Sequence, residues 1–442
     1  MCYKEDINFR KESLKKLLFV IQENEDAIIQ ALYDDFKKPA FEALLTETNY
    51  VITELNYFIK NIKQWAKPTL VLPSLLNFPS WDYIYSEPYG DVLIIAPWNY
   101  PFHLAISPLI AAVAAGNLVT LKPSENTPNT SKLIEKIISE TFSPDHVKVI
   151  LGGSSVAESL LGQKWDYIFF TGSIKVGKIV AKAAAENLTP VTLELGGKNP
   201  CIVDETANLK LAAKRISWGK FINAGQTCIA PDYILVQTKV KTRFITYLQE
   251  EIKNAYGENP EISPDYCRII NEQNWMRLTS LIETEKIILG GISNKETNYI
   301  APTLIDEPSL GSSIMKEEIF GPILPIISYE SEADIKKIIS SYEKPLSLYV
   351  FTENKAFAKK IIQNFSFGGG CINDTLIHFA NKRLPFGGVG HSGIGAYHGK
   401  RSFDLFSHKK PIVKKANWLD IPIRYAPYND KFKKIRRILK WL

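Results

Sequence analysis

Apolar residues near the start of the chain recur at helical spacing. Leu14, Leu17, Leu18 and Ile21 follow the i, i+3, i+4, i+7 pattern of a helix with one buried face. We predict two long helices over about the first 65 residues, ended by the prolines at 68 and 73.

Short apolar runs and helical stretches alternate through the next part of the chain. They are Val92–Ala96, His103–Ala115, Leu118–Leu121, Ser131–Thr141, Val147–Leu151, Tyr167–Phe170, Val176–Ala185 and Val191–Leu195. Strands that alternate with helices indicate βαβ units, a mostly parallel sheet and the α/β class. A second series follows Cys201 and predicts a second α/β domain. Polar and aromatic residues alternate over Trp81–Glu87, which predicts an extended segment, and six glycines over Gly387–Gly399 predict an irregular loop.

Composition narrows the kind of protein. The 442 residues are 45% hydrophobic and 23% charged, which excludes a largely disordered or low-complexity chain and fits two or three domains. The five cysteines include no C-x-x-C pair, so a reducing compartment is expected and a disulfide framework is not. No apolar run approaches ~20 residues, and Leu17–Ile21 is too short for a signal-peptide core. We therefore expect a cytoplasmic protein.

The net charge of +6 comes from the C-terminal end. Residues 409–442 hold eleven Lys or Arg against two Asp, a balance of +9, so the rest of the chain is −3. A mildly acidic body without a basic stripe argues against nucleic acid as a partner. Phe432, Ile435, Leu439 and Leu442 recur at helical spacing among six basic residues, with Trp441 at the edge. Such a basic amphipathic helix is suited to peripheral contact with an anionic membrane; a helix docked on its own subunit or a solvated tail are the alternatives.

A glycine turn follows the apolar run Tyr167–Phe170. Gly172 and Gly177 enclose a G-x-x-x-x-G-K pattern between a predicted strand and helix, where backbone N–H groups can hold a phosphate. The pattern is close to a nucleoside-triphosphate P-loop, and Asp204 even follows a later apolar run, but Ile179 replaces the Ser or Thr that holds Mg²⁺. A turn that only packs the helix on the strand is equally consistent with the pattern.

Three further residues suggest chemistry. Cys228 follows Asn223-Ala224-Gly225-Gln226-Thr227, and these small and polar residues leave a thiol able to ionise. Glu194 lies inside an apolar run, where burial would raise its pKa toward that of a general base; an ion pair with Lys198 is the structural alternative. Asn99 lies between two prolines, which would fix its amide as a donor to an oxyanion, unless it forms an Asx turn.

Seven motifs in order resemble the NAD(P)-dependent aldehyde dehydrogenases, and the fatty and aromatic aldehyde branch, class 3, in particular. They are Pro97–Pro101, Lys122–Glu125, Phe170–Ser173, Glu194–Lys198, Gly225–Cys228, Glu317–Pro322 and Pro385–Gly388. The resemblance covers about residues 8–411. It implies two Rossmann-like parallel-sheet domains, one for the cofactor and one catalytic, and a small β element for bridging and oligomerisation.

The resemblance also implies the roles of individual residues. Cys228 would be the nucleophile, Glu194 the base that activates water, and Asn99 the oxyanion donor. The cofactor, NAD with NADP also accepted, would be held by nine residues, and Tyr50 and Tyr100 would line the aldehyde pocket. The implied cofactor residues are Trp98, Lys122, Glu125, Gly172, Ser173, Val176, Gly177, Glu318 and Phe320. The spacing of His378, His391 and His398 gives no H-x-x-x-H pair, so no metal site is expected.

The domain limits follow from the same resemblance. We predict a cofactor domain at 1–78 and 90–198, a catalytic domain at 199–385, a bridging element at 79–89 and 400–413, and a basic tail at 414–442. The bridging element, with a strand-like segment at Arg401–Ser407, implies a homodimer. The rival interpretations are a P-loop NTPase, a cysteine hydrolase that needs no nucleotide, a reductase of the same fold, and a membrane-surface scaffold that rests on the tail alone.

Overall fold

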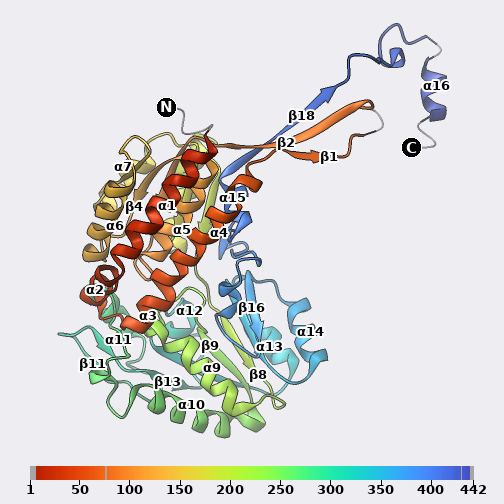
Figure 1. The fold of residues 1–442 in the computed structure, drawn as a ribbon. Coiled ribbons are helices and arrows are strands. Elements are labelled where there is room, and N and C mark those ends of the chain that lie inside the picture. Colours follow the sequence, from red (N-terminus) through yellow and green to blue (C-terminus); the bar gives the residue numbers. More distant parts are fainter. Residues whose placement is uncertain (1–5, 75–76, 430, 439–442) are drawn as a thin grey trace.

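The computed structural model describes residues 6–74, 77–429 and 431–438. The body of the molecule contains two sheets with helices packed on them, and a long β arm projects from it (Figure 1). The predicted residues Leu439, Trp441 and Leu442 of the tail, and the cysteine at position 2, lie outside the described residues.

The N-terminal region forms three longer helices, not two. They are α1 (Ile7–Glu23), α2 (Glu25–Phe36) and α4 (Asn49–Trp65); α3 (Ala40–Ala43) and a π-helical turn, η1 (Leu44–Thr48), lie before α4. The prediction was wrong because the chain breaks at Asn24. The Asn24 side chain donates to the Val20 carbonyl at 2.8 Å, and this contact ends the first helix.

The first sheet has the order β17-β7-β6-β3-β4-β5. Its parallel strands are β3 (Asp91–Ile95), β4 (Leu118–Lys122), β5 (Val147–Val149), β6 (Tyr167–Thr171) and β7 (Val191–Glu194), each within one or two residues of a predicted apolar run. β17 (Gly393–Ile394) pairs antiparallel with β7, so the predicted glycine loop contains one short strand. The strand order reverses between β3 and β6, which is where parallel sheets of this order bind ligands.

Helices cover both faces of this sheet. They are α5 (His103–Ala115), α6 (Pro128–Thr141), α7 (Ser154–Leu161) and α8 (Ile174–Glu186), of which α7 was not predicted. Successive residues of β3 alternate between the faces. Val92 and Ile94 pack in the cluster that contains α5 and α6, whereas Leu93 and Ile95 pack against α7 and α8. Every residue of α5 is buried, which explains its almost uninterrupted apolar sequence.

The second sheet has the order β10-β13-β14-β9-β8-β15-β16 and lies in the lower half of Figure 1. Its strands are β8 (Pro200–Val203), β9 (Tyr233–Gln237), β10 (Ile287–Leu289), β13 (Thr303–Asp306), β14 (Ile323–Tyr329), β15 (Ser347–Phe351) and β16 (Gly369–Ile372), all parallel except β10. Its helices are α9 (Leu209–Phe221), α10 (Lys241–Tyr256), α11 (Glu272–Ser280), α12 (Ser313–Lys316), α13 (Glu332–Ile339) and α14 (Lys355–Asn364). The α/β class and the second parallel sheet are thus confirmed.

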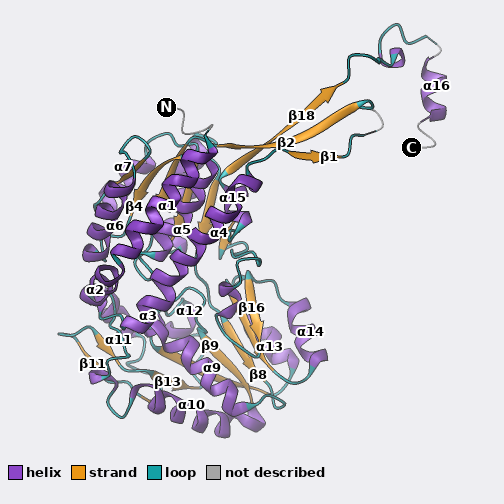
Figure 2. Cartoon of the chain, in the orientation of Figure 1, coloured by secondary structure: helices purple, strands orange, loops and turns teal. Residues whose placement is uncertain are grey.

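The arm is a three-stranded antiparallel sheet with order β1-β2-β18 (Figure 2). β1 (Thr69–Val71), β2 (Ser80–Pro88) and β18 (Ser407–Lys415) come from opposite ends of the chain. The predicted strand-like segment Arg401–Ser407 is wrong, because residues 400–405 form helix α15 (Lys400–Leu405), which packs on α5. Phe403 and Phe406 are both buried in the body. Residues three apart share one face of a helix, whereas in a strand they would point to opposite faces.

Candidate active site

The ends of neighbouring strands bring the predicted site residues to one edge of the first sheet. Ile95 of β3 is in register with Lys122 of β4 and with Phe170 of β6, and Thr171 of β6 is in register with Glu194 of β7. The loop 97–101, the Lys122–Glu125 turn, the glycine turn and Glu194 therefore lie side by side, because the carboxyl ends of parallel strands meet at the same edge.

The glycine turn begins α8 at the strand-order reversal. Ser173 caps the helix, with its Oγ accepting from the Val176 N–H at 3.4 Å. A Cβ on Gly172 would lie 2.6 Å from the Phe170 ring, and one on Gly177 would lie 2.6 Å from Leu195, so both positions need glycine for close packing. The Thr171 hydroxyl beside them is buried without a protein partner among the described residues.

The P-loop alternative does not fit this arrangement. The segment that imitates a metal-binding strand is β8, which belongs to the second sheet and pairs with β9 and β15. The carboxylate of Asp204 accepts hydrogen bonds from Thr206, which follows β8, and from Thr352, which follows β15 of the same sheet. Its partners hold it in the second domain, so it is not the acidic ligand of a phosphate loop on β6.

Lys122 and Glu125 form an ion pair at the end of β4. Lys122 Nζ lies 2.6 Å from Glu125 Oε2; the lysine side chain is buried and the glutamate side chain is about half exposed. A buried cation and a solvent-accessible carboxylate at this edge are suited to the hydroxyl groups of a ribose. Together with the capped start of α8 and the unpartnered Thr171 hydroxyl, they fit a dinucleotide.

Cys228 lies in a loop with unusual backbone geometry. The 3-10 turn η2 (Ile222–Gly225) before it holds Asn223 and Ala224 at φ values of 55° and 48°, and Gly225 at 73°. Burial raises the pKa of the Cys228 thiol, and the carboxyl groups of Glu318 and Glu194 raise it further, while backbone N–H groups act in the opposite direction. In the free enzyme this thiol is therefore protonated at neutral pH.

Asn99 is held beside the Cys228 loop by contacts across the chain. The Asn99 side-chain Nδ2 donates to the Gln226 backbone carbonyl at 3.0 Å, and the Asn99 backbone carbonyl accepts from Asn223 Nδ2 at 2.9 Å. The side chain is buried and donates to the backbone of a residue 127 positions away, which argues against the Asx-turn alternative. One N–H of the amide remains for another acceptor, because an amide nitrogen carries two hydrogens.

Glu194 is the most unusual carboxyl group at this edge. It is 3% exposed, and within the described part of the chain neither of its oxygens has a hydrogen-bond partner. Burial raises its pKa well above the usual value. The ion pair with Lys198 does not form: Lys198 Nζ lies 2.6 Å from Asp232 and donates to the carbonyls of residues 314 and 317. A buried carboxyl group without partners is a candidate for proton transfer.

Glu318 and Phe320 approach the same edge from the second half of the chain. The Glu318 carboxyl group lies against Gly196 and Gly197, and burial, with a contribution from Asp232, raises its pKa to about 8. The ring of Phe320 meets the ring of Trp98 edge to face, with centroids 5.3 Å apart. The two halves of the chain thus meet over the end of β7.

An apolar cavity of about 240 Å³ lies at this site. Cys228 and Glu194 line it, as do both predicted pocket residues, Tyr50 and Tyr100. The Tyr100 hydroxyl lies 2.7 Å from Thr227 Oγ1, and the Tyr50 ring is 4.1 Å from the His103 ring. Sequence reasoning missed the rest of the apolar and aromatic wall, which comes from several distant segments: His103, Trp218, Leu376, Ile377, Phe379, Phe386 and Tyr397.

A Rossmann-ordered sheet whose edge faces a cysteine and a buried glutamate is the arrangement of a dinucleotide-dependent oxidoreductase. Residues 4–412 match the model of the aldehyde dehydrogenase family, and the chain belongs to that family. Enzymes of this family oxidise aldehydes with NAD⁺ or NADP⁺, and this protein is an aldehyde dehydrogenase. The class 3 resemblance is confirmed by its relatives.

Three comparisons are especially close. The chain is 51% identical to a 4,4'-diaponeurosporen-aldehyde dehydrogenase of Staphylococcus aureus, over 98% of this chain and 95% of that protein. It is 45% identical to aldehyde dehydrogenase family 3 member A2 of Macaca fascicularis, over 93% of this chain and 84% of that protein. The solved structure of Staphylococcus aureus AldH in a substrate-bound state matches with a TM-score of 0.97 and 50% identity, covering 99% of this chain and 96% of that one.

Proposed function

We propose that the enzyme oxidises medium- or long-chain aliphatic and aromatic aldehydes to carboxylic acids through a covalent intermediate on Cys228. The observation that carries the proposal is the apolar cavity that Cys228 and Glu194 line. Its wall offers an aldehyde chain aromatic and aliphatic contacts, and the S. aureus relative is itself named for the aldehyde of an apolar compound, 4,4'-diaponeurosporene.

The residues divide the chemistry among them. The Cys228 thiol first gives its proton to solvent water, and the resulting thiolate attacks the carbonyl carbon and forms a C–S bond. The oxyanion that develops accepts from the second N–H of the Asn99 amide and from the backbone N–H of Cys228. NAD(P)⁺, when bound, accepts the hydride that leaves this carbon, and a thioester remains on Cys228. Glu194 then takes a proton from water, whose oxygen attacks the thioester; the C–S bond breaks, and the acid leaves.

The cofactor sites follow from the same edge. We assign the adenosine ribose to Lys122 and Glu125, and the pyrophosphate to the turn of Gly172, Ser173, Val176 and Gly177. We assign the nicotinamide and its ribose to Glu318 and Phe320, and Trp98 packs beside Phe320. The Glu125 carboxylate disfavours a 2′-phosphate by repulsion, while Lys122 favours it, so we propose NAD with NADP also accepted.

The arm and the tail are assigned to assembly. Exposed apolar side chains along the arm, such as Leu70, Trp81, Ile412 and Val413, favour a homodimer that covers them. Within the tail, α16 (Lys431–Ile438) carries the exposed Phe432 among basic residues, which favours peripheral contact with an anionic membrane. No helix in the described ranges is long and apolar enough to cross a membrane.

We propose the domain limits predicted from the sequence, with two changes: α15 (Lys400–Leu405) belongs to the cofactor domain, because it packs on α5, and β1 (Thr69–Val71) belongs to the arm.

Absorbance of reduced nicotinamide tests the reaction directly. Purified protein is mixed with NAD⁺ or NADP⁺ and with aldehydes of increasing length, and with benzaldehyde. We expect turnover that rises with chain length and is abolished by Cys228→Ala, while that variant still binds NAD⁺. Ester hydrolysis without nucleotide and no aldehyde oxidation would favour the cysteine-hydrolase alternative instead.

A further inference from the structure

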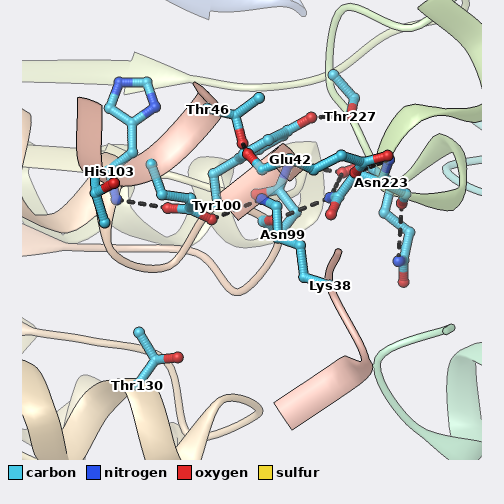
Figure 3. A network of polar contacts seen from close by, with 12 residues as sticks. Lys38, Glu42, Thr46, Asn99, Tyr100, His103, Thr130, Asn223 and Thr227 are labelled. Atoms are coloured by element: carbon cyan, nitrogen blue, oxygen red, sulfur yellow. Dashed lines mark hydrogen bonds and ion pairs between the residues drawn. The ribbon is translucent and has the colours of Figure 1, made fainter. Parts of the chain in front are cut away.

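A buried cation, Lys38, lies against Tyr100 of the loop 97–101 (Figure 3). The Lys38 side chain, which follows α2, is fully buried. Its Nζ lies 2.8 Å from Glu47 Oε1, in an ion pair that is also fully buried, and 4.0 Å from the centroid of the Tyr100 ring. A lysine in such a place is rare unless a carboxylate accompanies it.

Two glutamates of this region each accept a backbone N–H from one of the loops. Glu47 Oε2 accepts from the His103 N–H at 2.8 Å, where the loop with Asn99 and Tyr100 enters α5. Glu42 Oε2 accepts from the Asn223 N–H at 2.9 Å, where the Cys228 loop begins. Each loop is thus tied to a different carboxylate of the same segment.

The loops are also bonded to one another. Asn223 Nδ2 donates to the carbonyls of Asn99 and Gln226, and the Tyr100 hydroxyl lies 2.7 Å from Thr227 Oγ1. Figure 3 shows Glu42 next to Asn223, and Tyr100 between Lys38 and Thr227. Movement of either glutamate would therefore reach the residue before Cys228 as well as Asn99.

The local helix geometry makes this double contact possible. Glu42 and Glu47 are five residues apart, and in an α-helix, at about 100° per residue, their side chains would point about 140° apart. The π-helical turn Leu44–Thr48, which contains Glu47, has wider i→i+5 hydrogen bonding. This wider turn brings side chains five residues apart closer to one face of the helix. Such turns are frequent at functional sites.

We propose that Lys38, Glu42 and Glu47 are positioning residues that hold the Asn99 loop and the Cys228 loop in the geometry needed for attack on the aldehyde. The inference rests on the proposed roles of Cys228 and Asn99. The left-handed conformation of Asn223 and Ala224 persists only where surrounding contacts fix it, and the bond from Glu42 is one such contact. The Lys38 cation pairs with the Glu47 carboxylate and lies over the Tyr100 ring, and its charge also acts on the nearby Glu42 carboxyl group.

A pair of substitutions at Glu42 separates the hydrogen bond from the charge. Glu42→Gln keeps an oxygen that accepts from Asn223, whereas Glu42→Leu removes it. The rate of Cys228 alkylation by iodoacetamide, located by peptide mass spectrometry, reports on the loop without cofactor or substrate. We expect Glu42→Leu to change this rate and to lower kcat by about tenfold or more, with KM for NAD⁺ near that of the wild type, and Glu42→Gln to restore both.

Asp35→Ala is the matched control for lost stability. Asp35 accepts four hydrogen bonds from Asn129 and Thr130 at the start of α6. These bonds lie outside both the Asn99 loop and the Cys228 loop. This variant is expected to lower Tm and leave the alkylation rate of Cys228 unchanged. Wild-type alkylation and kcat in Glu42→Leu, alongside a lowered Tm, would overturn the inference.

Two variants test the cation. Lys38→Met leaves Glu47 as an uncompensated buried carboxylate and is expected to lower Tm, whereas Lys38→Met with Glu47→Gln removes both charges and is expected to recover Tm. The inference requires that the double variant still loses about tenfold in kcat; full recovery of kcat with Tm would contradict it. If wild-type enzyme oxidises no aldehyde, the proposed function fails, but the alkylation rates still decide whether the three residues position the loop.

Discussion

The carboxyl group of Glu318 lies directly against Gly196, the second residue after β7. A Cβ at Gly196 would be 2.1 Å from Glu318 Oε2 and 2.3 Å from Oε1. No L side chain fits there unless the carboxyl group moves. The position of Glu318 therefore depends on Gly196, although the two residues are more than a hundred positions apart in the sequence.

Gly196→Ala is therefore expected to act through Glu318. The displaced carboxyl group would no longer meet the nicotinamide ribose, and we expect KM for NAD⁺ to rise by about tenfold, the loss of roughly one hydrogen bond to a charged group. Steady-state titration of NAD⁺ measures this, and Glu318→Gln is the comparison. If Gly196→Ala leaves KM for NAD⁺ at its wild-type value, Glu318 does not bind the cofactor.

Asn99→Ala tests the oxyanion donor. The amide is held by Gln226, and its remaining N–H is the proposed donor to the oxygen that develops charge. Loss of one such donor costs about 10²–10³ in kcat. We expect a loss of that size, measured as the rate of the first turnover, with NAD⁺ binding retained. A first turnover at the wild-type rate would assign the oxyanion to another group.

Glu54→Gln is expected to change how stability depends on pH. Glu54 of α4 is 2% exposed and bonds the Ser107 hydroxyl, and burial raises its pKa from 4.5 to about 7. Between these values the folded state binds more protons than the unfolded state, so wild-type stability falls as pH rises through this window, and is fully retained below it. The variant lacks this loss, which is on the order of 3 kcal/mol.

Urea unfolding at pH 5 and pH 8 measures the difference. The variant should gain stability relative to the wild type as the pH rises, whereas Glu250→Gln on the exposed side of α10 serves as the control. A constant difference between Glu54→Gln and the wild type at the two pH values would show that Glu54 titrates alike in the folded and unfolded states.

The strands and helices of the first sheet could be predicted because each has a single pattern. α5, for example, is buried on all sides and its predicted bounds agree with the structure, since an apolar run of thirteen residues is too long for a strand. Residues 400–407 could not be predicted in the same way. Phe403 is two positions from Leu405, as on one face of a strand, and three positions from Phe406, as on one face of a helix, and packing on α5 decides for the helix.

The candidate site divides in the same way. Glu194 and Asn99 carry a local signal, because a glutamate inside an apolar run and an amide between two prolines are both unusual. The pocket wall has no such signal: His103, Trp218 and Phe379 are ordinary residues in their own segments and meet only in the folded chain. Likewise, nothing in the sequence around Lys38 indicates its contact with Tyr100.

Removal of residues 417–442 tests the tail. α16 projects beyond the arm, away from the body that holds the cavity (Figure 1). We expect the truncated enzyme to oxidise a short aldehyde at the wild-type rate and to lose cosedimentation with vesicles containing phosphatidylserine, because each basic residue near such a surface contributes about 1 kcal/mol. Equal cosedimentation of the two forms would remove the proposed membrane contact, and vesicles of neutral lipid are the control for non-specific pelleting.

Glu194→Gln separates the two halves of the reaction. The side chain lines the cavity beside Cys228, and its oxygens have no hydrogen-bond partner among the residues that the structure describes. An amide of the same shape therefore preserves the packing and removes only the ability to take a proton. Attack by Cys228 and loss of the hydride do not require water, so one reduced cofactor per site is expected in a burst. Hydrolysis of the thioester does require water activated by the carboxylate, so turnover should then stall. Rapid mixing with an excess of aldehyde and NAD⁺ measures the burst, and mass spectrometry should find the acyl group on Cys228. Steady turnover at the wild-type rate would show that another group activates the water.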